Sequence, residues 1–174
     1  MSHIRSFEPV SSVDAHVLIL GSMPGRRSLE QNQYYAHPSN AFWKIMGALV
    51  GAYPGIPYQN RLAILRTAGI ALWDVLDSCV RETSMDSDIR QESANDFSAF
   101  FALHPHITQV FFNGNKAEHC FRKFVLDKQI LPPLKLHRLP STSPAHAGLR
   151  YADKLQAWHA VISGLPDDSK RKNA

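Results

Sequence analysis

The chain has 174 residues, of which 44% are hydrophobic and 20% are charged. This length and composition are typical of one soluble globular domain with a sizeable core. The net charge of +4 and the pI near 9.2 permit a nucleic-acid partner without requiring one. There is no apolar stretch of about 18 residues and no apolar leader after Met1, so neither a membrane span nor a secretory signal is predicted.

The two cysteines, Cys79 and Cys120, lie in apolar segments and are too few for a disulfide framework. We expect them to be buried, reduced thiols of a cytoplasmic protein. An iron–sulfur cluster usually takes four thiolates, so these two do not hold one by themselves. No linker divides the chain, and we expect a monomer with one domain over residues 1–166 and a polar tail over residues 167–174.

The first predicted element, after a polar lead-in over residues 1–16, is a buried strand at residues 17–20 (VLIL). It is closed at once by residues 21–25 (GSMPG), and a short apolar run that ends in Gly and Pro predicts a strand entering a tight loop. A long polar and aromatic loop follows, and loops of this length in compact domains are usually functional. A helix is then predicted over residues 39–50, with Ser39 as its N-cap.

Helices and strands alternate through the middle of the chain. A short helix is predicted at residues 60–67, and a second buried strand at residues 70–73 (IALW). The polar residues 74–92 are predicted to form a loop. Ser93, with Asp96 three residues later, resembles a capping box at the start of the next helix.

Two further strands are predicted, at residues 107–112 and 134–139, and each leads through a loop into a helix. The last helix is predicted to bury one apolar face, made of Tyr151, Leu155, Trp158 and Ile162. Strands that alternate with helices indicate an α/β fold. We therefore predict a three-layer α/β/α domain with a central four-stranded parallel sheet.

Polar and aromatic residues gather where these predicted strands end, and ligands of parallel sheets bind beyond the carboxyl ends of the strands. The loops concerned are residues 21–39, 74–92, 113–115 and 140–148. Their position predicts a single site. The turn at residues 21–25 lacks the spacing of a nucleotide-binding P-loop and of a dinucleotide-binding fingerprint, so it is either a turn that approaches a ligand or a plain structural turn.

Each candidate residue has a structural interpretation beside a functional one. Of the adjacent Tyr34 and Tyr35, one is expected in the core, and the other is then free to stack on a planar ligand such as a nucleobase. His37 would make a backbone hydrogen bond in its loop. Asn40 would cap its helix, or its amide would position a water or bind a ligand edge. Asp74 would be a structural partner, or would accept a ring N–H from a base.

The loop at residues 140–148 (PSTSPAHAG) is rich in small hydroxyl side chains. Its backbone amides and the hydroxyls of Ser141, Thr142 and Ser143 suit phosphate contacts, although a solvated loop would have the same composition. The sequence has no metal-ligand spacing such as H-E-x-x-H and no G-x-S-x-G nucleophile elbow. Neither a metal site nor that nucleophile is predicted.

Three stretches of the sequence resemble the uracil-DNA glycosylase superfamily. Residues 21–25 with residues 35–43 (YAHPSNAFW) resemble its first motif, and residues 72–76 (LWDVL) resemble its base-reading strand. Residues 141–147 (STSPAHA) resemble its second motif, the loop that enters the minor groove. The resemblance covers residues 17–163 and looks closest to the mismatch-specific branch and its relative, the hypoxanthine-DNA (deoxyinosine) glycosylases.

This resemblance implies roles for individual residues. The superfamily usually has Asp or Asn at the position of Met23 to activate water, and often His at the position of Ser141 to stabilise the departing base. Both differences argue against an ordinary uracil-DNA glycosylase and fit the hypoxanthine branch, in which the Asn matching Asn40 serves instead. Tyr35 would then stack on the flipped base, and Asp74 would accept its ring N–H.

The same resemblance implies contacts with the base and with the DNA. Backbone amides near Ser22 and Met23 would donate to the base carbonyl. The second-motif loop would press into the minor groove, where Ala145 is a small wedge and His146 does the filling. The residues implied in DNA binding are His37, Ser141, Thr142, Ser143, Pro144, Ala145 and His146.

The predicted function is hydrolysis, without a cofactor, of the N-glycosidic bond of a deaminated base, hypoxanthine, that is flipped out of DNA. Within the same class, the alternative is a glycosylase for uracil or mismatched bases. From another class, the alternative is a non-catalytic nucleic-acid-binding module, and Met23 and Ser141 favour it.

Overall fold

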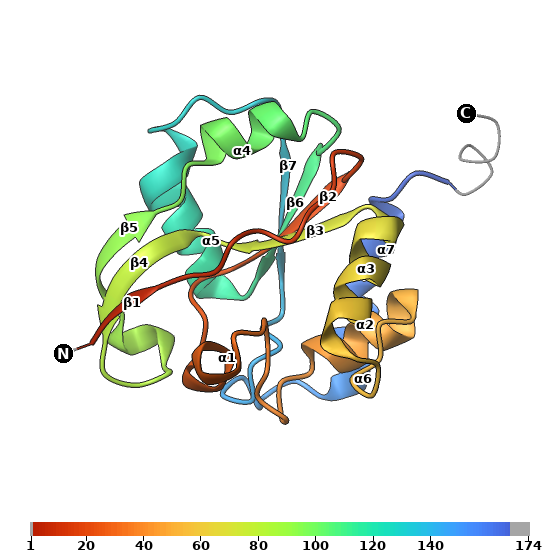
Figure 1. Cartoon of the computed structure of the whole chain (residues 1–174), viewed down its shortest axis with the longest axis horizontal. Helices are drawn as coiled ribbons and strands as arrows, with labels where there is room; N and C mark the ends of the chain where they lie inside the picture. The colour runs from red at the N-terminus through yellow and green to blue at the C-terminus, as the bar shows by residue number, and fades with distance from the viewer. Residues whose placement is uncertain (1, 168–174) are drawn as a thin grey trace.

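The computed structural model describes residues 2–167, so the predicted tail lies outside the described residues from position 168 onward. At its centre is a parallel sheet with the strand order β3-β2-β6-β7 (Figure 1). Its strands are β2 (Val17–Gly21), β3 (Ile70–Asp74), β6 (Gln109–Asn113) and β7 (Lys135–Leu139). The predicted fold class is confirmed, because the four strands are parallel and match the predicted ones.

Alternate residues of β2 point to opposite faces of the sheet, as the strand geometry requires. Leu18 and Leu20 pack in one core, and Val17 and Ile19 pack in the other. Figure 1 shows helices on both sides of the sheet. The first core receives side chains from α4 (Phe97–Leu103), α5 (Asn115–Phe121) and the π-helical turn η2 (Arg122–Leu126). The second receives them from α2 (Phe42–Val50), α3 (Tyr58–Ala68), α6 (Tyr151–Trp158) and α7 (Ala160–Ser163).

A second, antiparallel sheet with the order β1-β4-β5 lies beside the first. Its strands are β1 (Ser2–Arg5), β4 (Leu76–Arg81) and β5 (Arg90–Ala94), and the short turn η1 (Asp86–Asp88) joins the last two. The predictions of a plain lead-in over residues 1–16 and of a loop over residues 74–92 are therefore wrong. These strands are defined by their backbone hydrogen bonds to one another. The sequence of β5 is polar and largely exposed, so it lacks the alternation of apolar and polar residues that predicts a strand.

Two helix starts differ from their predictions. α2 begins at Phe42, and the Asn40 side chain, rather than Ser39, accepts the first free N–H, with 3.0 Å between Asn40 Oδ1 and Phe42 N. The α4 cap is Asp96 alone, which accepts from the N–H of Ala99, whereas Ser93 lies in β5. The long loop before α2 also contains a short helix, α1 (Arg26–Gln31), that was not predicted.

The last predicted helix is divided in two at His159. α6 ends at Trp158 and α7 begins at Ala160, and the break changes which side chains face the core. Trp158 is fully buried as predicted, but Val161 takes the buried position that the periodicity gave to Ile162, which is 37% exposed.

The topological switch point of the sheet is at β2, because the chain adds β3 on one side of this strand and then β6 and β7 on the other side. β2 pairs with β3 on one side and with β6 on the other, and the segments that follow β2 and β6 cover opposite faces. In open α/β sheets a crevice forms at such a point, and ligands bind there. The topology thus places the loops after β2 and β6 around one potential site.

We expect Val161→Ala to lower the free energy of unfolding by about 2 kcal/mol, because it removes two buried methyl groups and leaves a cavity. Ile162→Ala, one position along, should cost less than about 1 kcal/mol because that side chain is partly in solvent. Urea denaturation of both variants measures the difference. Equal costs, or a larger cost at Ile162, would contradict the described break between α6 and α7.

Candidate active site

Gly21, the last residue of β2, lies beneath two polar side chains. A Cβ at this position would be 2.6 Å from Asp74 Oδ1 and 2.9 Å from the Tyr35 hydroxyl oxygen. Both distances are too short for carbon against oxygen, so a residue with a side chain would displace one group or the other. The two residues that the sequence placed in one site are therefore brought together here.

Within the described part of the chain, buried side-chain polar atoms without a hydrogen-bond partner occur in three residues. They are the Tyr35 hydroxyl, Asp74 Oδ2, and Nε and Nη1 of Arg81. Each such group costs about 1–3 kcal/mol, and folded proteins rarely leave them unpaired. Tyr35 and Asp74 meet at Gly21, and Arg81 Nη2 donates to the carbonyl of nearby Pro24. Their concentration at one place marks a site that is built to bind polar groups.

Asp74 combines deep burial with charged neighbours. It ends β3 and is 3% exposed. Burial raises the pKa of its carboxyl group to about 7, the charge of Asp86 acts in the same direction, and the Arg81 guanidinium opposes them. Near neutral pH, both protonation states of this side chain are therefore populated. The ionised form accepts hydrogen bonds, and the neutral form also donates one.

Tyr35 presents an aromatic ring at the same place. The ring stacks on Phe42, with 4.1 Å between ring centroids and 29° between ring planes. Its backbone φ of +53° is rare for a residue with a side chain, and such conformations cluster at functional sites. Burial and the Asp74 charge raise the pKa of its phenol, which therefore stays protonated. Tyr34 is the tyrosine in the core, at 4% exposure, and its hydroxyl donates to the carbonyl of Glu8.

Thr142 ties together the loops that surround the site. Its hydroxyl accepts from Asn113 Nδ2 and its N–H donates to Asn113 Oδ1, both at 2.9 Å. Its carbonyl accepts from the N–H of Ala41 at 3.0 Å. The end of β6, the start of α2 and the second-motif loop are therefore held in one arrangement. Because the hydroxyl is bonded inside and the residue is 1% exposed, its predicted contact with phosphate is not supported.

The rest of the second-motif loop is shaped by its own hydroxyl groups. The hydroxyls of Ser141 and Ser143 each accept a backbone N–H two residues further on, at 3.2 Å. Residues 144–146 form an exposed tip. The buried ammonium group of Lys154 fixes the far end of this tip by donating to the carbonyl of His146 at 2.8 Å.

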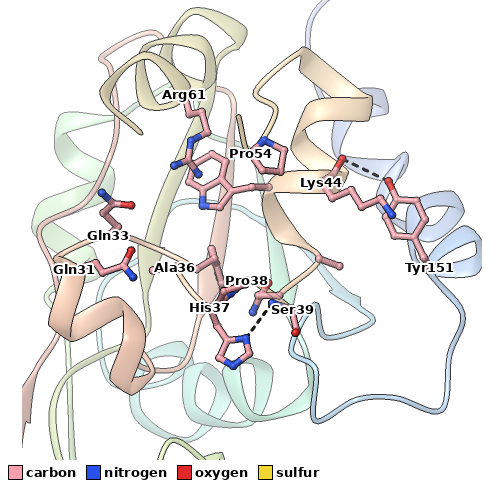
Figure 2. Close-up of a pocket in the computed structure, with 14 residues that line it drawn as sticks. Gln31, Gln33, Ala36, His37, Pro38, Ser39, Lys44, Pro54, Arg61 and Tyr151 are labelled. Atoms are coloured by element: carbon pink, nitrogen blue, oxygen red, sulfur yellow. Dashed lines mark hydrogen bonds between the residues drawn. The ribbon is translucent and has the colours of Figure 1, made fainter. Parts of the chain in front are cut away.

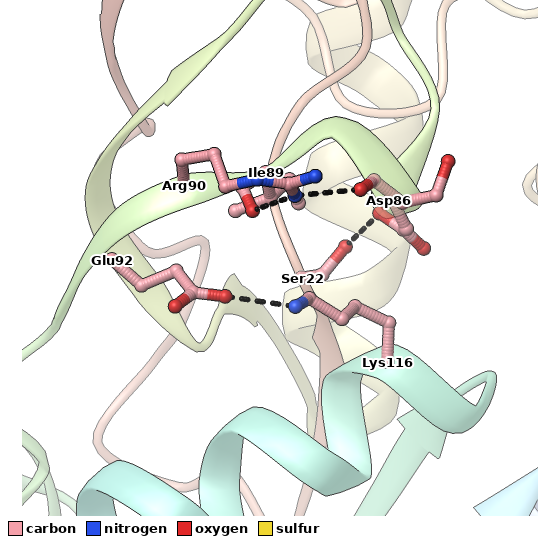
Figure 3. A network of polar contacts seen from close by, with 7 residues as sticks. Ser22, Asp86, Ile89, Arg90, Glu92 and Lys116 are labelled. Carbon is pink, nitrogen blue, oxygen red and sulfur yellow. Dashed lines mark hydrogen bonds and ion pairs between the residues drawn. The ribbon is translucent and has the colours of Figure 1, made fainter.

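The remaining predicted residues have different surroundings. The Ser22 hydroxyl donates to Asp86 Oδ1 at 2.6 Å, a contact visible in Figure 3. The Met23 side chain packs in the core on the α4 side. His37 is exposed, and its Nδ1 accepts the N–H of Ser39 at 3.0 Å, which places the proton of the neutral ring on Nε2. Nε2 is thus a donor at the surface.

A pocket of about 500 Å³ opens beside Tyr35 and Asn40 (Figure 2). Its charged lining residues are both cations. The Lys44 ammonium lies 4.2 Å from the centroid of the Tyr151 ring, and the Arg61 guanidinium lies 4.5 Å from that of Trp43. The other lining groups include the carboxamides of two glutamines, Gln31 and Gln33. Such a lining suits an anionic chain.

Sequence reasoning missed Arg81, Asn113 and the two cations of this pocket. Arg81 lay in a segment predicted to be a loop, and only its position after Val80 gave a weak sign of burial. Lys44 lay on the polar side of a predicted helix, where cations are ordinary. Only the folded arrangement shows what each of these side chains faces.

Over residues 2–167, no group of three or more His, Cys, Asp or Glu side chains is arranged to hold a metal ion. None of the helices described in that range is long and apolar enough to cross a membrane.

Asp74→Asn should change how stability depends on pH. Because the pKa of Asp74 is raised from 3.8 to about 7 on folding, the wild type loses stability as pH rises between these values, by up to about 1.4 kcal/mol per pH unit, and then levels off. The variant lacks this loss. We expect its stability relative to wild type to rise by about 2 kcal/mol from pH 5 to pH 8 in urea denaturation. A pH-independent difference would show that Asp74 titrates normally.

Comparison with known proteins agrees with this geometry. The family model of the Uracil DNA glycosylase superfamily matches residues 8–162. The chain is 36% identical over 163 residues to a hypoxanthine DNA glycosylase of Methanosarcina acetivorans, covering 91% of this chain and 97% of the relative. It is 41% identical over 114 residues to a protein of the same name from Methanosarcina barkeri, covering 65% of this chain and 72% of the relative.

The fold is also shared with a solved structure. The solution NMR structure of a candidate uracil DNA glycosylase from Methanosarcina acetivorans is 32% identical and matches with a TM-score of 0.75, over 92% of this chain and 97% of that chain. The family model covers most of the chain, and the parallel sheet agrees with it. This chain belongs to the uracil DNA glycosylase superfamily.

Proposed function

We propose that the protein is a monofunctional DNA glycosylase that hydrolyses the N-glycosidic bond of hypoxanthine, the base of deoxyinosine, after the nucleotide is flipped out of DNA. The observation that carries the proposal is the convergence of Asp74 and Tyr35 on Gly21, next to Asn40. A buried acceptor, an aromatic ring and an amide are the groups that binding and hydrolysing a planar base require. The relatives named hypoxanthine DNA glycosylase support this choice of base.

The polar edge of hypoxanthine matches the groups at the end of β2. The base offers a ring N–H beside a carbonyl oxygen. Ionised Asp74 accepts the N–H, and the backbone amides near Ser22 and Met23 donate to the oxygen. The ring of Tyr35 stacks on the base with the face that Phe42 does not cover.

Asn40 positions the attacking water in this proposal. Its Oδ1 is fixed by the N–H of Phe42, and the neighbouring Ala41 is fixed by the carbonyl of Thr142, so the amide is held rigidly above the pocket. An amide is uncharged and therefore a weak general base. Bond cleavage then depends on stabilising negative charge on the departing base with preorganised donors, and turnover is slow.

The DNA strand lies along the cationic pocket and the exposed tip of the second-motif loop. Lys44 and Arg61 face the phosphates beside the flipped nucleotide, and His37 Nε2 donates to another. Residues 144–146 enter the minor groove. One copy of the chain acts alone, and its two buried, free thiols suit the cytoplasm.

The central test is cleavage of duplexes that carry one inosine, uracil or xanthine, read as alkali-labile sites on a gel. We expect the wild type to cleave the inosine duplex fastest. Asn40→Ala should reduce this cleavage by about 100-fold or more, because the water loses its positioning group. Loss of the hydrogen bond that Asn40 Oδ1 accepts from the N–H of Phe42 should cost only about 1 kcal/mol of stability, which a thermal melt checks.

Ser163→Ala is the control, since Ser163 is exposed on α7 and does not line the pocket beside Asn40, and it should keep nearly full activity. A wild type that binds the inosine duplex without cleaving any of the three substrates would support the non-catalytic module instead. Full activity of a folded Asn40→Ala protein would remove Asn40 from the mechanism and leave the enzyme assignment intact.

Lys44→Ala tests the path of the DNA strand. If Lys44 contacts a phosphate, its loss should weaken binding of all duplexes alike and reduce the slope of log K against log salt by about one. The measurement is binding of an inosine duplex by the Asn40→Ala protein at several salt concentrations. Lys128→Ala, an exposed lysine near η2, is the control and should leave the slope unchanged. Equal slopes for the two lysine variants would move the strand away from this pocket.

A further inference from the structure

Arg81 is an unusual buried cation. It ends β4 and is only 3% exposed. Its Nη2 donates to the carbonyl of Pro24, but Nε and Nη1 have no hydrogen-bond partner among the described residues. Buried guanidinium groups are ordinarily paired with carboxylates, because desolvation costs several kcal/mol. Among residues 2–167, however, none of the ion pairs includes Arg81.

The charges that surround Arg81 belong to the candidate active site. The guanidinium lies close enough to act electrostatically on Asp74, as does the carboxylate of Asp86. The Asp86 carboxylate in turn accepts a hydrogen bond from the hydroxyl of Ser22, the residue directly after Gly21 (Figure 3). Arg81 and Asp86 therefore bring opposite charges to the turn that follows β2.

The end of β4 and the loop that follows it hold this turn by two backbone contacts and one side-chain contact. Arg81 donates to the Pro24 carbonyl, Asp86 accepts from Ser22, and Ser84 Oγ accepts from the N–H of Arg26 at 2.9 Å. The turn contains the backbone amides to which the base carbonyl would bind. Its geometry therefore depends on a loop that carries none of the superfamily motifs.

We propose that Arg81 is a positioning residue of the base site, which holds the turn after β2 through Pro24 and supplies the positive charge that balances the Asp74 carboxylate. It acts through these two residues and does not touch the base. The inference rests on the proposed function only where its test measures activity.

The groups that face Asp74 decide how it titrates. They are Arg81 from β4, Asp86 from η1, and the phenols of Tyr34 and Tyr35 from the segment after α1. Both phenols stay neutral because burial raises the pKa of each. The pKa of Asp74 is therefore set by burial and by two opposed charges, so removing Arg81 should raise it and removing the Asp86 charge should lower it.

Three single variants test this directly. The measurement is the side-chain carboxyl ¹³C chemical shift of Asp74 against pH, in the protein without DNA. For Arg81→Gln we expect the midpoint to rise by about one pH unit, and for Asp86→Asn to fall by about half a unit. Arg90→Gln is the matched control, since Arg90 is exposed on β5 and its guanidinium donates to the carbonyls of Ser87 and Ile89. Its midpoint should equal that of wild type.

Cleavage of an inosine duplex gives the second readout. The acid limb of the pH profile of kcat/KM should move up for Arg81→Gln and down for Asp86→Asn, because ionised Asp74 is the form that accepts the base N–H. Activity that falls equally at every pH, with no change in the Asp74 midpoint, would make Arg81 a structural residue only and overturn the proposal.

Arg81→Lys covers the case in which Arg81→Gln does not fold. Lysine keeps the charge, so the Asp74 midpoint should stay within about 0.3 pH units of wild type, although the weaker hold on Pro24 should lower kcat/KM. A midpoint that moves by a full unit in Arg81→Lys would contradict the role of charge. If no variant and no wild type cleaves DNA, the carboxyl titration still decides the inference, and only the proposed function fails.

Discussion

The site depends on the bare backbone at Gly21. Two oxygen atoms, one from Asp74 and one from the Tyr35 hydroxyl, lie within 3 Å of the position that a Cβ would take. Because β2 is paired on both sides, its carboxyl end cannot shift sideways to make room. The absence of one side chain therefore lets an aromatic residue from the first motif and a carboxylate from the neighbouring strand meet at the switch point of the sheet. The turn that Arg81 contacts through Pro24 begins directly after Gly21, and the Tyr35 ring at this meeting point stacks on Phe42.

Burial of Asp74 lowers the free energy of unfolding, but it also leaves a carboxyl group free to bind a ligand. A carboxyl group with a pKa of about 7 destabilises the folded state wherever it is ionised, and the unpaired polar atoms of Tyr35 and Arg81 add to the cost. Proteins tolerate such groups where function needs them and stabilise the fold elsewhere. Here the stabilisation comes from two apolar cores on either side of the sheet and from Thr142, whose hydrogen bonds hold three segments together without any charge.

The sequence predicts those parts of the molecule that local patterns encode. Apolar runs locate the four parallel strands, and the rule that ligands bind at carboxyl ends locates Tyr35, Asn40 and Asp74. The small sheet escapes prediction because β1 and β5 are mostly polar, and because β4 lacks a regular alternation and pairs with β1 at the far end of the chain. The burial of Thr142 and of Arg81 escapes it for a related reason, since a hydrogen bond to Asn113 or to Pro24 leaves no trace in composition or periodicity.

The structure explains how the site is built without the usual side chains at two motif positions, Met23 and Ser141. Met23 joins the core on the α4 side, so in the proposed function the first motif would contribute backbone donors and no side-chain base. The hydroxyl of Ser141 is used within its own turn, so the second motif contributes shape rather than an imidazole. A glycosylase that lacks both groups depends more on the geometry of the backbone donors after β2, and the buried Arg81 guanidinium holds that turn through the carbonyl of Pro24. Arg81 at the end of β4 and Asp86 in η1 both lie outside the motifs, and they would then supply charges that the side chains of Met23 and Ser141 do not.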